Sequence, residues 1–186
     1  LADRGINLIG KKVSSWNPNI NDLFIDKADV VTIEDGEYIY EITRKENSTV
    51  LYVKDVTDYE KIRLEYYASR PVIAVIVIDN YDELIRGLTD RKRNELRDAI
   101  EDKLLQWCEG KGGFFRRYDR DRYLYVFEER HLDELRENKF ASLLDSVRSV
   151  ASPSGIRATV SVGIGRDGDS LDENYNFAIL GTEMAL

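Results

Sequence analysis

The chain has little of the residues from which catalytic and metal centres are most often built. Its 186 residues include one cysteine, Cys108, one histidine, His131, and only three prolines. A single cysteine excludes a disulfide framework within the chain, and a single histidine excludes a His-rich metal site. A Ser-His-Asp triad would depend on His131. Because Cys108 follows Trp107 in a helical pattern, we expect a buried thiol in a reducing compartment rather than a nucleophile.

Basic clusters are scarce as well. The net charge is -8 at pH 7, and Asp and Glu outnumber Lys and Arg in residues 1–69 and in residues 70–186 alike. Binding to a nucleic-acid backbone depends on clustered Lys and Arg, so the composition argues against nucleic acid as a partner. No signal peptide is evident, and the chain begins with Leu1 rather than methionine. We therefore expect a piece of a longer protein.

A continuous apolar run, PVIAVIVI, occupies residues 71–78. Its Val and Ile content, between a proline and a polar segment, predicts the central strand of a sheet that is covered on both faces. The run is too short to span a membrane. Ligand sites in such sheets lie where strands end, so Asp79 and Asn80, which follow the run, are candidate site residues. The alternative is that these two residues only turn the chain.

The first 54 residues have a different pattern. After short helical turns, alternating β-branched and aromatic residues predict three antiparallel strands with one covered face. Three strands with little helix make a thin core, so we expect a packing partner that is missing or supplied by another chain. The next segment, 55–70, predicts an amphipathic helix that begins near Thr57 or Asp58 and stops at Pro71. The predicted strands are 29–33, 37–43 and 49–54.

From Pro71 onward the predicted elements follow the order β-α-β-β-α-β-α. This is the split-βαβ, ferredoxin-like pattern of the α+β class, in which a central hairpin joins two βα halves. Such a fold hosts many functions and fixes none of them. The elements are strand 71–78, helix 90–110, strands 114–117 and 123–127, helix 132–150, strand 156–165 and helix 170–186.

Three short segments of residues 71–186 resemble the motifs of a GGDEF domain, the fold of diguanylate cyclases. The segment VIVIDNY resembles the family's strand-end Asp-x-Asp-x-Phe. Residues 117–124, RYDRDRYL, occupy the place of the family's Arg-Leu-Gly-Gly-Asp-Glu-Phe. Residues 159–165, TVSVGIG, are similar to its Thr-Val-Ser-Ile-Gly-Val strand. The resemblance implies a GGDEF-type fold for this part of the chain.

The same motifs depart from the family where a cyclase needs them. A cyclase holds two divalent metals with carboxylates and places phosphate against two glycines. Val77 stands at the family's first carboxylate, and only Asp79 is kept. Asp119 and Arg120 replace the glycine pair, whose lack of side chains allows phosphate to come close, and Arg122 replaces the family's glutamate. We therefore predict that this domain is not a diguanylate cyclase.

A degenerate motif of this kind resembles the GdpP (YybT-type) cyclic-di-AMP phosphodiesterases. The matching segments are Val77–Leu84, VIDNYDEL, and Asp121-Arg122-Tyr123. This family places two transmembrane helices, a PAS sensor, a degenerate GGDEF domain and a DHH/DHHA1 phosphodiesterase in that order. The resemblance implies that residues 1–54 are part of a PAS domain, 55–70 its linker helix and 71–186 the degenerate GGDEF domain. The chain has no Asp-His-His motif, so hydrolysis of the cyclic dinucleotide is implied only for the parent protein.

The resemblance also implies a location and partners. The parent would lie on the cytoplasmic side of the cell membrane, held by helices that precede this piece, while the fragment itself would be soluble. Its C-terminal neighbour would be the DHH/DHHA1 domain. Helix 55–70 is either a parallel dimer coil that passes a signal onward, giving a homodimer, or a simple connector.

Two interpretations of the predicted hairpin stay open. In the first, guanidinium groups bind the phosphates of a nucleotide triphosphate and carboxylates bind a metal. The resemblance suggests weak hydrolysis of ATP there, with magnesium held by Asp79 and Asp121. In the second, the hairpin is a self-neutralising surface turn whose ion pairs are each worth below about 1 kcal/mol. The candidate nucleotide-binding residues are Asp79, Asn80, Arg117, Asp119, Arg120, Asp121 and Arg122, of which the three aspartates Asp79, Asp119 and Asp121 would serve hydrolysis.

The PAS-like part contains aromatic residues that would line a haem pocket. No histidine occurs in residues 1–70, so an axial imidazole is excluded. Core packing of these rings is the alternative interpretation. The residues are Trp16, Phe24, Tyr38 and Tyr40.

Overall fold

The computed structural model describes residues 9–25, 27–45, 48–137 and 140–185. The chain divides between Tyr66 and Tyr67 into two compact units. This division falls inside helix α1 (Thr57–Ala68). In the part of the chain that is described, none of the helices combines the length and the apolar character that a membrane span requires.

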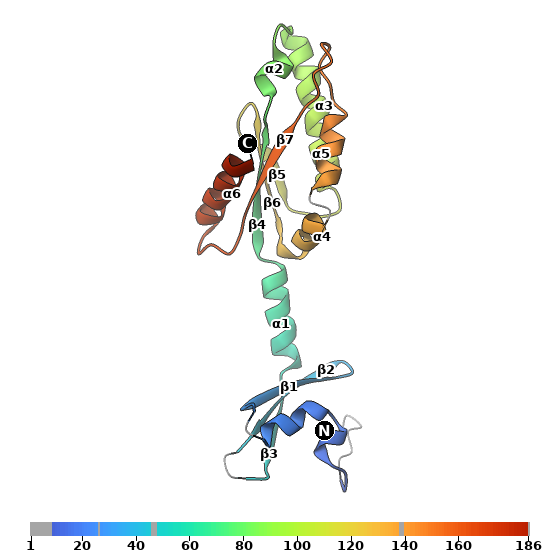
Figure 1. Ribbon diagram of the computed structural model, residues 1–186, viewed down its shortest axis with the longest axis vertical. Helices are drawn as coiled ribbons and strands as arrows, with labels where there is room; N and C mark the ends of the chain where they lie inside the picture. Colours follow the sequence, from blue (N-terminus) through green and yellow to red (C-terminus); the bar gives the residue numbers. More distant parts are fainter. Residues whose placement is uncertain (1–8, 26, 46–47, 138–139, 186) are drawn as a thin grey trace. The chain divides into compact units, whose positions relative to one another are not determined.

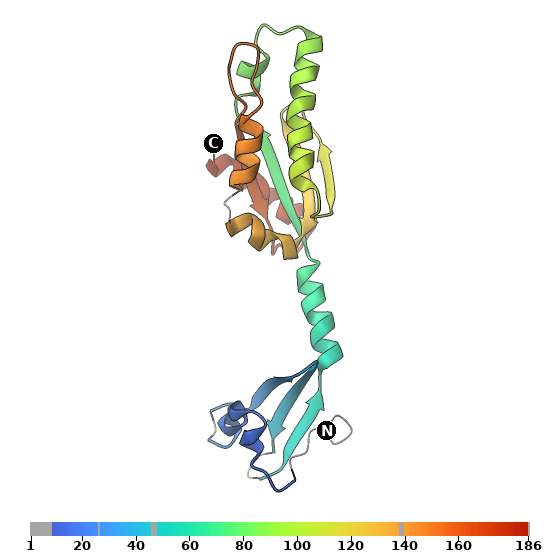
Figure 2. The same ribbon diagram turned by 90° about the vertical axis from the view of Figure 1, so that its right-hand side faces the viewer.

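The first unit is built on a three-stranded antiparallel sheet in the order β1-β2-β3. The sheet confirms the predicted meander. Short 3-10 helices pack against one face of it (Figure 2). There Ile20 and Leu23 join Tyr40 and Ile42 in one buried cluster. The elements are η2 (Val13–Ser15), η3 (Pro18–Leu23), β1 (Val30–Asp35), β2 (Tyr38–Arg44) and β3 (Leu51–Asp55).

The start of α1 is fastened to the sheet by the side chains of Asp55 and Thr57. The Asp55 carboxylate accepts hydrogen bonds from the Thr57 backbone N–H at 3.0 Å and from the Thr57 hydroxyl at 2.5 Å. The same hydroxyl oxygen accepts from the backbone N–H of Ile39 at 2.9 Å. Asp55 therefore satisfies the first free N–H of the helix, and the predicted caps, Thr57 and Asp58, already lie within it.

The second unit contains a four-stranded sheet in the order β5-β6-β4-β7, with β4 antiparallel to both of its neighbours. This strand order confirms the predicted ferredoxin-like fold. Short helices α2 and η4 lie outside the predicted set. The elements are β4 (Pro71–Ile78), α2 (Tyr81–Ile85), α3 (Asp90–Cys108), β5 (Phe114–Arg117), β6 (Arg122–Glu128), η4 (Glu129–His131), α4 (Leu132–Glu137), α5 (Ala141–Arg148), β7 (Val160–Gly165) and α6 (Leu171–Ala185).

Strand β4 is central and buried on both faces, as its apolar run predicts. Figures 1 and 2 show α3, α4 and α5 on one face of the sheet and α6 on the other. Ile76 and Ile78 join the core under α3 and α5, together with Ile100 of α3. Val75 and Val77 join a smaller cluster under α6. Burial on both sides explains why this strand shows no polar alternation.

Two predicted elements differ from the observed ones. The single helix expected over 132–150 is two helices, α4 and α5, because Phe140 takes a left-handed backbone conformation (φ 58°) that an α-helix does not continue through. The strand expected from Ile156 begins at Val160. Before it, the chain turns at Gly155 (φ 84°) and makes only an isolated bridge between Ala151 and Arg157.

Candidate functional site

The ends of three strands meet where β4 stops. The backbone N–H of Ile78 donates to the carbonyl of Asp121, at the start of β6, at 2.9 Å. The next N–H, that of Asp79, donates to the carbonyl of Thr159, just before β7, at 3.0 Å. These two bonds place the β5–β6 hairpin and the β7 entry on opposite sides of Asp79.

A hollow of about 260 Å³ lies at this point. It is lined by residues 78–83 and by Asp121, so three of the candidate residues, Asp79, Asn80 and Asp121, lie together there. Four carboxylates border it, those of Asp79, Asp82, Glu83 and Asp121. Within the described ranges, no three or more His, Cys, Asp or Glu side chains converge in a way that could hold a metal ion. Magnesium binding by Asp79 and Asp121 stays a prediction.

Asn80 uses both polar atoms of its side chain to hold the backbone. Its amide nitrogen donates to the carbonyl of Arg157 at 2.8 Å, and its amide oxygen accepts from the N–H of Thr159 at 3.1 Å. Its own carbonyl accepts from the N–H of Leu84 in α2 at 3.0 Å. These contacts favour the interpretation that Asn80 shapes the turn, because both polar atoms of its side chain already bond to the backbone.

Arg120 reaches from the hairpin tip to α2. Its two terminal nitrogens each lie 3.3 Å from an oxygen of Asp82, and its guanidinium carbon lies 5.9 Å from the centre of the Tyr81 ring. The backbone N–H of Arg120 donates to the side chain of Asp119 at 2.7 Å. Asp119 thus shapes the tip and is absent from the lining of the hollow. The three aspartates predicted to act together are divided between these two places.

The remaining hairpin arginines do not line the hollow. Arg117 lies opposite Tyr123 in the β5–β6 register. Arg122 lies near Tyr118, whose ring meets that of Tyr175 on α6 at 6.3 Å. Burial raises the pKa of Tyr118 to about 12, helped by its hydrogen bond with Tyr175 and opposed by Arg122. The arginine cluster predicted from the sequence is therefore spread over the hairpin.

Sequence analysis did not assign three residues of the hollow, Tyr81, Asp82 and Glu83. They form the first turn of α2, which was not among the predicted helices. The signal was present in the run DNYDE, whose acidic residues directly follow the buried strand. Negative side chains are favourable in the first turn of a helix, so the run also fits a helix start.

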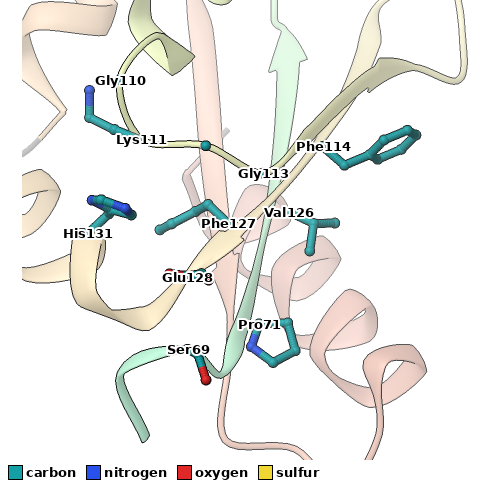
Figure 3. Close-up of a pocket in the computed structure, with 11 residues that line it drawn as sticks. Ser69, Pro71, Gly110, Lys111, Gly113, Phe114, Val126, Phe127, Glu128 and His131 are labelled. Carbon is teal, nitrogen blue, oxygen red and sulfur yellow. The ribbon is translucent and has the colours of Figure 1, made fainter. Parts of the chain in front are cut away.

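A larger pocket, of about 440 Å³, lies at the other end of β4 (Figure 3). It contains the single histidine, His131, and Lys111, whose ammonium group donates to the carbonyl of Trp107 at 2.9 Å. The described lining includes none of the predicted site residues. It consists of residues 110–114 and 126–128 with Ser69, Pro71 and His131.

Cys108 is poorly suited to nucleophilic chemistry. Burial raises the pKa of its thiol to about 12, and the opposing charge of Lys111 is the smaller effect. The thiolate is the reactive form, so a thiol that stays protonated at neutral pH is inert.

The aromatic side chains of the first unit pack against other side chains of the same unit. The rings of Trp16 and Tyr40 meet edge to face at 5.3 Å, and the Trp16 indole N–H donates to Asp35 at 2.8 Å. The guanidinium of Arg44 lies over the Phe24 ring, 5.1 Å from its centre. These contacts are those of core and surface packing, and haem binding in this unit stays a prediction.

Comparison with known families assigns the domain around the hollow. Residues 76–186 match the model of the family described as cyclic-di-AMP phosphodiesterase GdpP-like, GGDEF domain. The chain belongs to this family. The match begins inside β4 and contains the hollow, the β5–β6 hairpin and both helical layers of the GdpP-like GGDEF domain.

Curated relatives extend the similarity beyond this domain. The cyclic-di-AMP phosphodiesterase PdeA of Listeria monocytogenes is 30% identical over 96% of this chain and 27% of its own length. The cyclic-di-AMP phosphodiesterase GdpP of Bacillus subtilis is 35% identical over 86% of this chain and 24% of its own length. The chain therefore spans about a quarter of the length of the curated relatives that it matches.

Crystal structures confirm the GGDEF-like fold. A sensory box/GGDEF family protein from Caulobacter crescentus superposes with a TM-score of 0.54 at 14% identity, covering 68% of this chain and 85% of that one. The GGDEF domain of DgcB from the same organism, in complex with c-di-GMP, gives a TM-score of 0.54 at 15% identity over 69% and 78% of the two chains. At this identity the comparison establishes the fold and nothing further.

Proposed function

We propose that the GdpP-like GGDEF domain is a regulatory part of a cyclic-di-AMP phosphodiesterase and does not make cyclic di-GMP. The observation that carries the proposal is the hairpin tip, where Arg120 extends to Asp82 across the positions at which a cyclase leaves bare glycine backbone. Phosphate cannot approach this backbone as closely as it approaches glycine.

The position of Val77 supports the same conclusion. This residue stands where the family's first metal-binding carboxylate would be, yet it is only 4% exposed and packs in the cluster that contains Ala178 of α6. An apolar side chain in a dry cluster offers no ligand to a metal ion. Two-metal phosphoryl transfer would therefore lack one of its metal-binding carboxylates here.

The direct test supplies purified chain with GTP and Mg²⁺ and measures cyclic di-GMP by chromatography. We expect no product, while an active diguanylate cyclase in the same assay gives one. The variant Asp119→Gly/Arg120→Gly is the matched control. It restores glycine at the hairpin tip but keeps Val77, so it separates the effect of the tip from that of the missing carboxylate. Formation of cyclic di-GMP by the unaltered chain would refute the proposal.

The regulatory role belongs to a longer protein. We infer that residues 1–54 are part of a PAS sensor and that 55–70 links it to the GGDEF domain, with a DHH/DHHA1 phosphodiesterase domain following and membrane helices preceding. The names of the curated relatives support a phosphodiesterase as the longer protein, and Asp55 and Thr57 supply a fixed joint between sheet and linker. In the full-length protein, Thr57→Val should change the rate of cyclic-di-AMP hydrolysis without abolishing hydrolysis. An unchanged rate would argue against a relay through this joint.

A second candidate function is binding of ATP with magnesium, followed by slow hydrolysis. The specific support is the hollow itself, since Asp79 and Asp121 come together at a strand end where nucleotides bind in many α/β folds. Calorimetric titration with Mg-ATP should show binding, and Asp121→Ala should weaken it and abolish turnover. Asp133→Ala, an exposed change on α4, is the control. Turnover that survives Asp121→Ala would exclude this site.

A further inference from the structure

Arg120 is a basic side chain that touches the lining of the hollow, and it is already engaged there. Both of its terminal nitrogens face the carboxylate of Asp82 at 3.3 Å, and the guanidinium lies beside the Tyr81 ring. The contact joins the hairpin tip to the first turn of α2, two segments that are 38 positions apart in sequence. It is thus a bridge across one border of the hollow.

The charge of the hollow makes this bridge important for any anionic ligand. Among the described residues that line it, four carry carboxylates and none is basic. A nucleotide phosphate that entered beside Asp79 and Asp121 would be repelled unless a cation accompanied it or a guanidinium turned toward it. While Arg120 stays on Asp82, its positive charge is shared with that carboxylate.

We propose that Arg120 is a latch, bound to Asp82 in the free chain and transferred to a phosphate group when Mg-nucleotide enters the hollow. This inference rests on the proposed nucleotide site and names the residue that controls entry to it. A planar guanidinium suits the exchange because the same pair of N–H groups binds a carboxylate or a phosphate.

The surroundings of the latch allow it to open without unfolding the hairpin. The side chains of Arg120 and Asp82 are 63% and 69% exposed, so water and salt screen their attraction. The two ends of the turn, residues 118 and 121, are held separately, by the Tyr118–Tyr175 ring contact and by the bond from the Ile78 N–H to the Asp121 carbonyl. Release of Arg120 would therefore loosen only the tip.

The experiment compares two neighbouring carboxylates in the 186-residue chain, with Mg-ATP binding measured by calorimetry. Asp82→Asn removes a charge from the hollow and also releases Arg120, whereas Glu83→Gln removes a charge from the same lining and leaves the latch closed. We expect Asp82→Asn to tighten binding roughly fourfold, as when the competent fraction rises from about one quarter to nearly all. Glu83→Gln, which only lowers the repulsion of an anion, should tighten it less than about twofold. Adding Arg120→Ala to Asp82→Asn should cancel the gain.

A second measurement reports on the latch without nucleotide. Amide hydrogen exchange at residues 119–121 should become roughly threefold faster in Asp82→Asn and in Arg120→Ala, and stay unchanged in Glu83→Gln. Equal gains in affinity from Asp82→Asn and Glu83→Gln, or unchanged exchange in all variants, would overturn the latch. Exchange at residues 119–121 could become faster in Asp82→Asn although no variant binds Mg-ATP. That result would refute the nucleotide site and the transfer of Arg120 to phosphate, but not the Arg120–Asp82 contact.

Discussion

Hydrogen-bond partners decide what single residues do in this domain. At the end of β4, Asn80 gives both polar side-chain atoms to the backbone, whereas Asp79 and Asp121 border the hollow. Two buried tyrosines of β6 differ in the same way. The hydroxyl of Tyr125 donates to the carbonyl of Gly112 at 2.8 Å, while that of Tyr123 is buried with no partner among the residues that the structure describes.

This difference predicts opposite effects of one small change. Tyr123→Phe removes a buried hydroxyl that makes no hydrogen bond within the described residues, so it should leave the free energy of unfolding unchanged or raise it by about 1 kcal/mol. Tyr125→Phe removes a hydroxyl that is bonded and leaves the Gly112 carbonyl unpaired, so it should lower that free energy by about 1 kcal/mol. Urea titration followed by circular dichroism measures both. A loss in Tyr123→Phe as large as that in Tyr125→Phe would show that the Tyr123 hydroxyl has a partner.

At the scale of elements, the close packing of α6 on β7 depends on residues without side chains. A methyl group added at Gly163 would collide with the backbone carbonyl of Ala178, and one added at Gly165 would collide with that of Asn174. Both obstacles are backbone atoms, so neither can turn aside. The TVSVGIG motif therefore has a packing reason for its glycines, namely that the helix lies directly on the strand.

Gly163→Ala should accordingly lower the free energy of unfolding of the second unit by about 2–3 kcal/mol, since overpacking forces the helix away from the sheet. Thermal denaturation followed by circular dichroism measures the change. Glu183→Ala, an exposed substitution on the same helix, should alter stability by less than about 0.5 kcal/mol. A melting temperature unaffected by Gly163→Ala would contradict this account of the helix–strand contact.

The junction between β2 and α1 depends on one hydroxyl. Thr57→Val keeps the shape of the side chain but leaves the N–H of Ile39 without its partner. It also removes one of the two hydrogen bonds that Asp55 Oδ1 accepts, while the bond from the backbone N–H of residue 57 remains. We expect a loss of about 1–2 kcal/mol in the first unit, the usual cost of leaving a partly buried backbone N–H without its hydrogen bond. Amide exchange at Ile39 should become faster, and exposed Thr32→Val on β1 is the control. Unchanged exchange at Ile39 would mean that this bond does not secure the junction.

At the scale of the whole molecule, the described residues of each unit form hydrophobic clusters of their own. One contains Ile20 and Ile42 under the three-stranded sheet, and another contains Ile100 and Leu104 of α3 against the four-stranded sheet. The division between the units lies after Tyr66, within α1. Each unit therefore has its own hydrophobic driving force for folding.

Separate hydrophobic clusters in the two units predict two unfolding transitions. Ile20→Ala and Ile100→Ala each empty a fully buried position and should cost about 2–4 kcal/mol, each in its own unit only. Amide exchange resolved along the chain would report the loss in residues 30–55 for the first variant and in residues 71–165 for the second. If either variant destabilised both regions equally, the chain would unfold as one cooperative unit.

How well the sequence predicts each part of the structure depends on whether that part is set by local or by long-range interactions. The strand 71–78 and helix α3 show their character in local hydrophobic patterns, and both were found with nearly their observed bounds. The break at Phe140 was missed because apolar spacing continues across it, and α2 was missed because five residues carry too little periodicity. At the site, the predicted Asp79 and Asp121 do come together, whereas the predicted arginine cluster does not.

By itself the sequence determined the ferredoxin-like order, the central strand and the membership of the GdpP-like GGDEF family. Each of these can be recognised from runs of contiguous residues, and folding does not alter such local patterns. Only the tertiary structure decided that Asn80 holds Thr159, that Arg120 binds Asp82 and that Gly163 lies under α6. These contacts join residues many positions apart. Which partner a polar or small side chain meets is set by how the helices and strands pack, and local sequence does not contain that information.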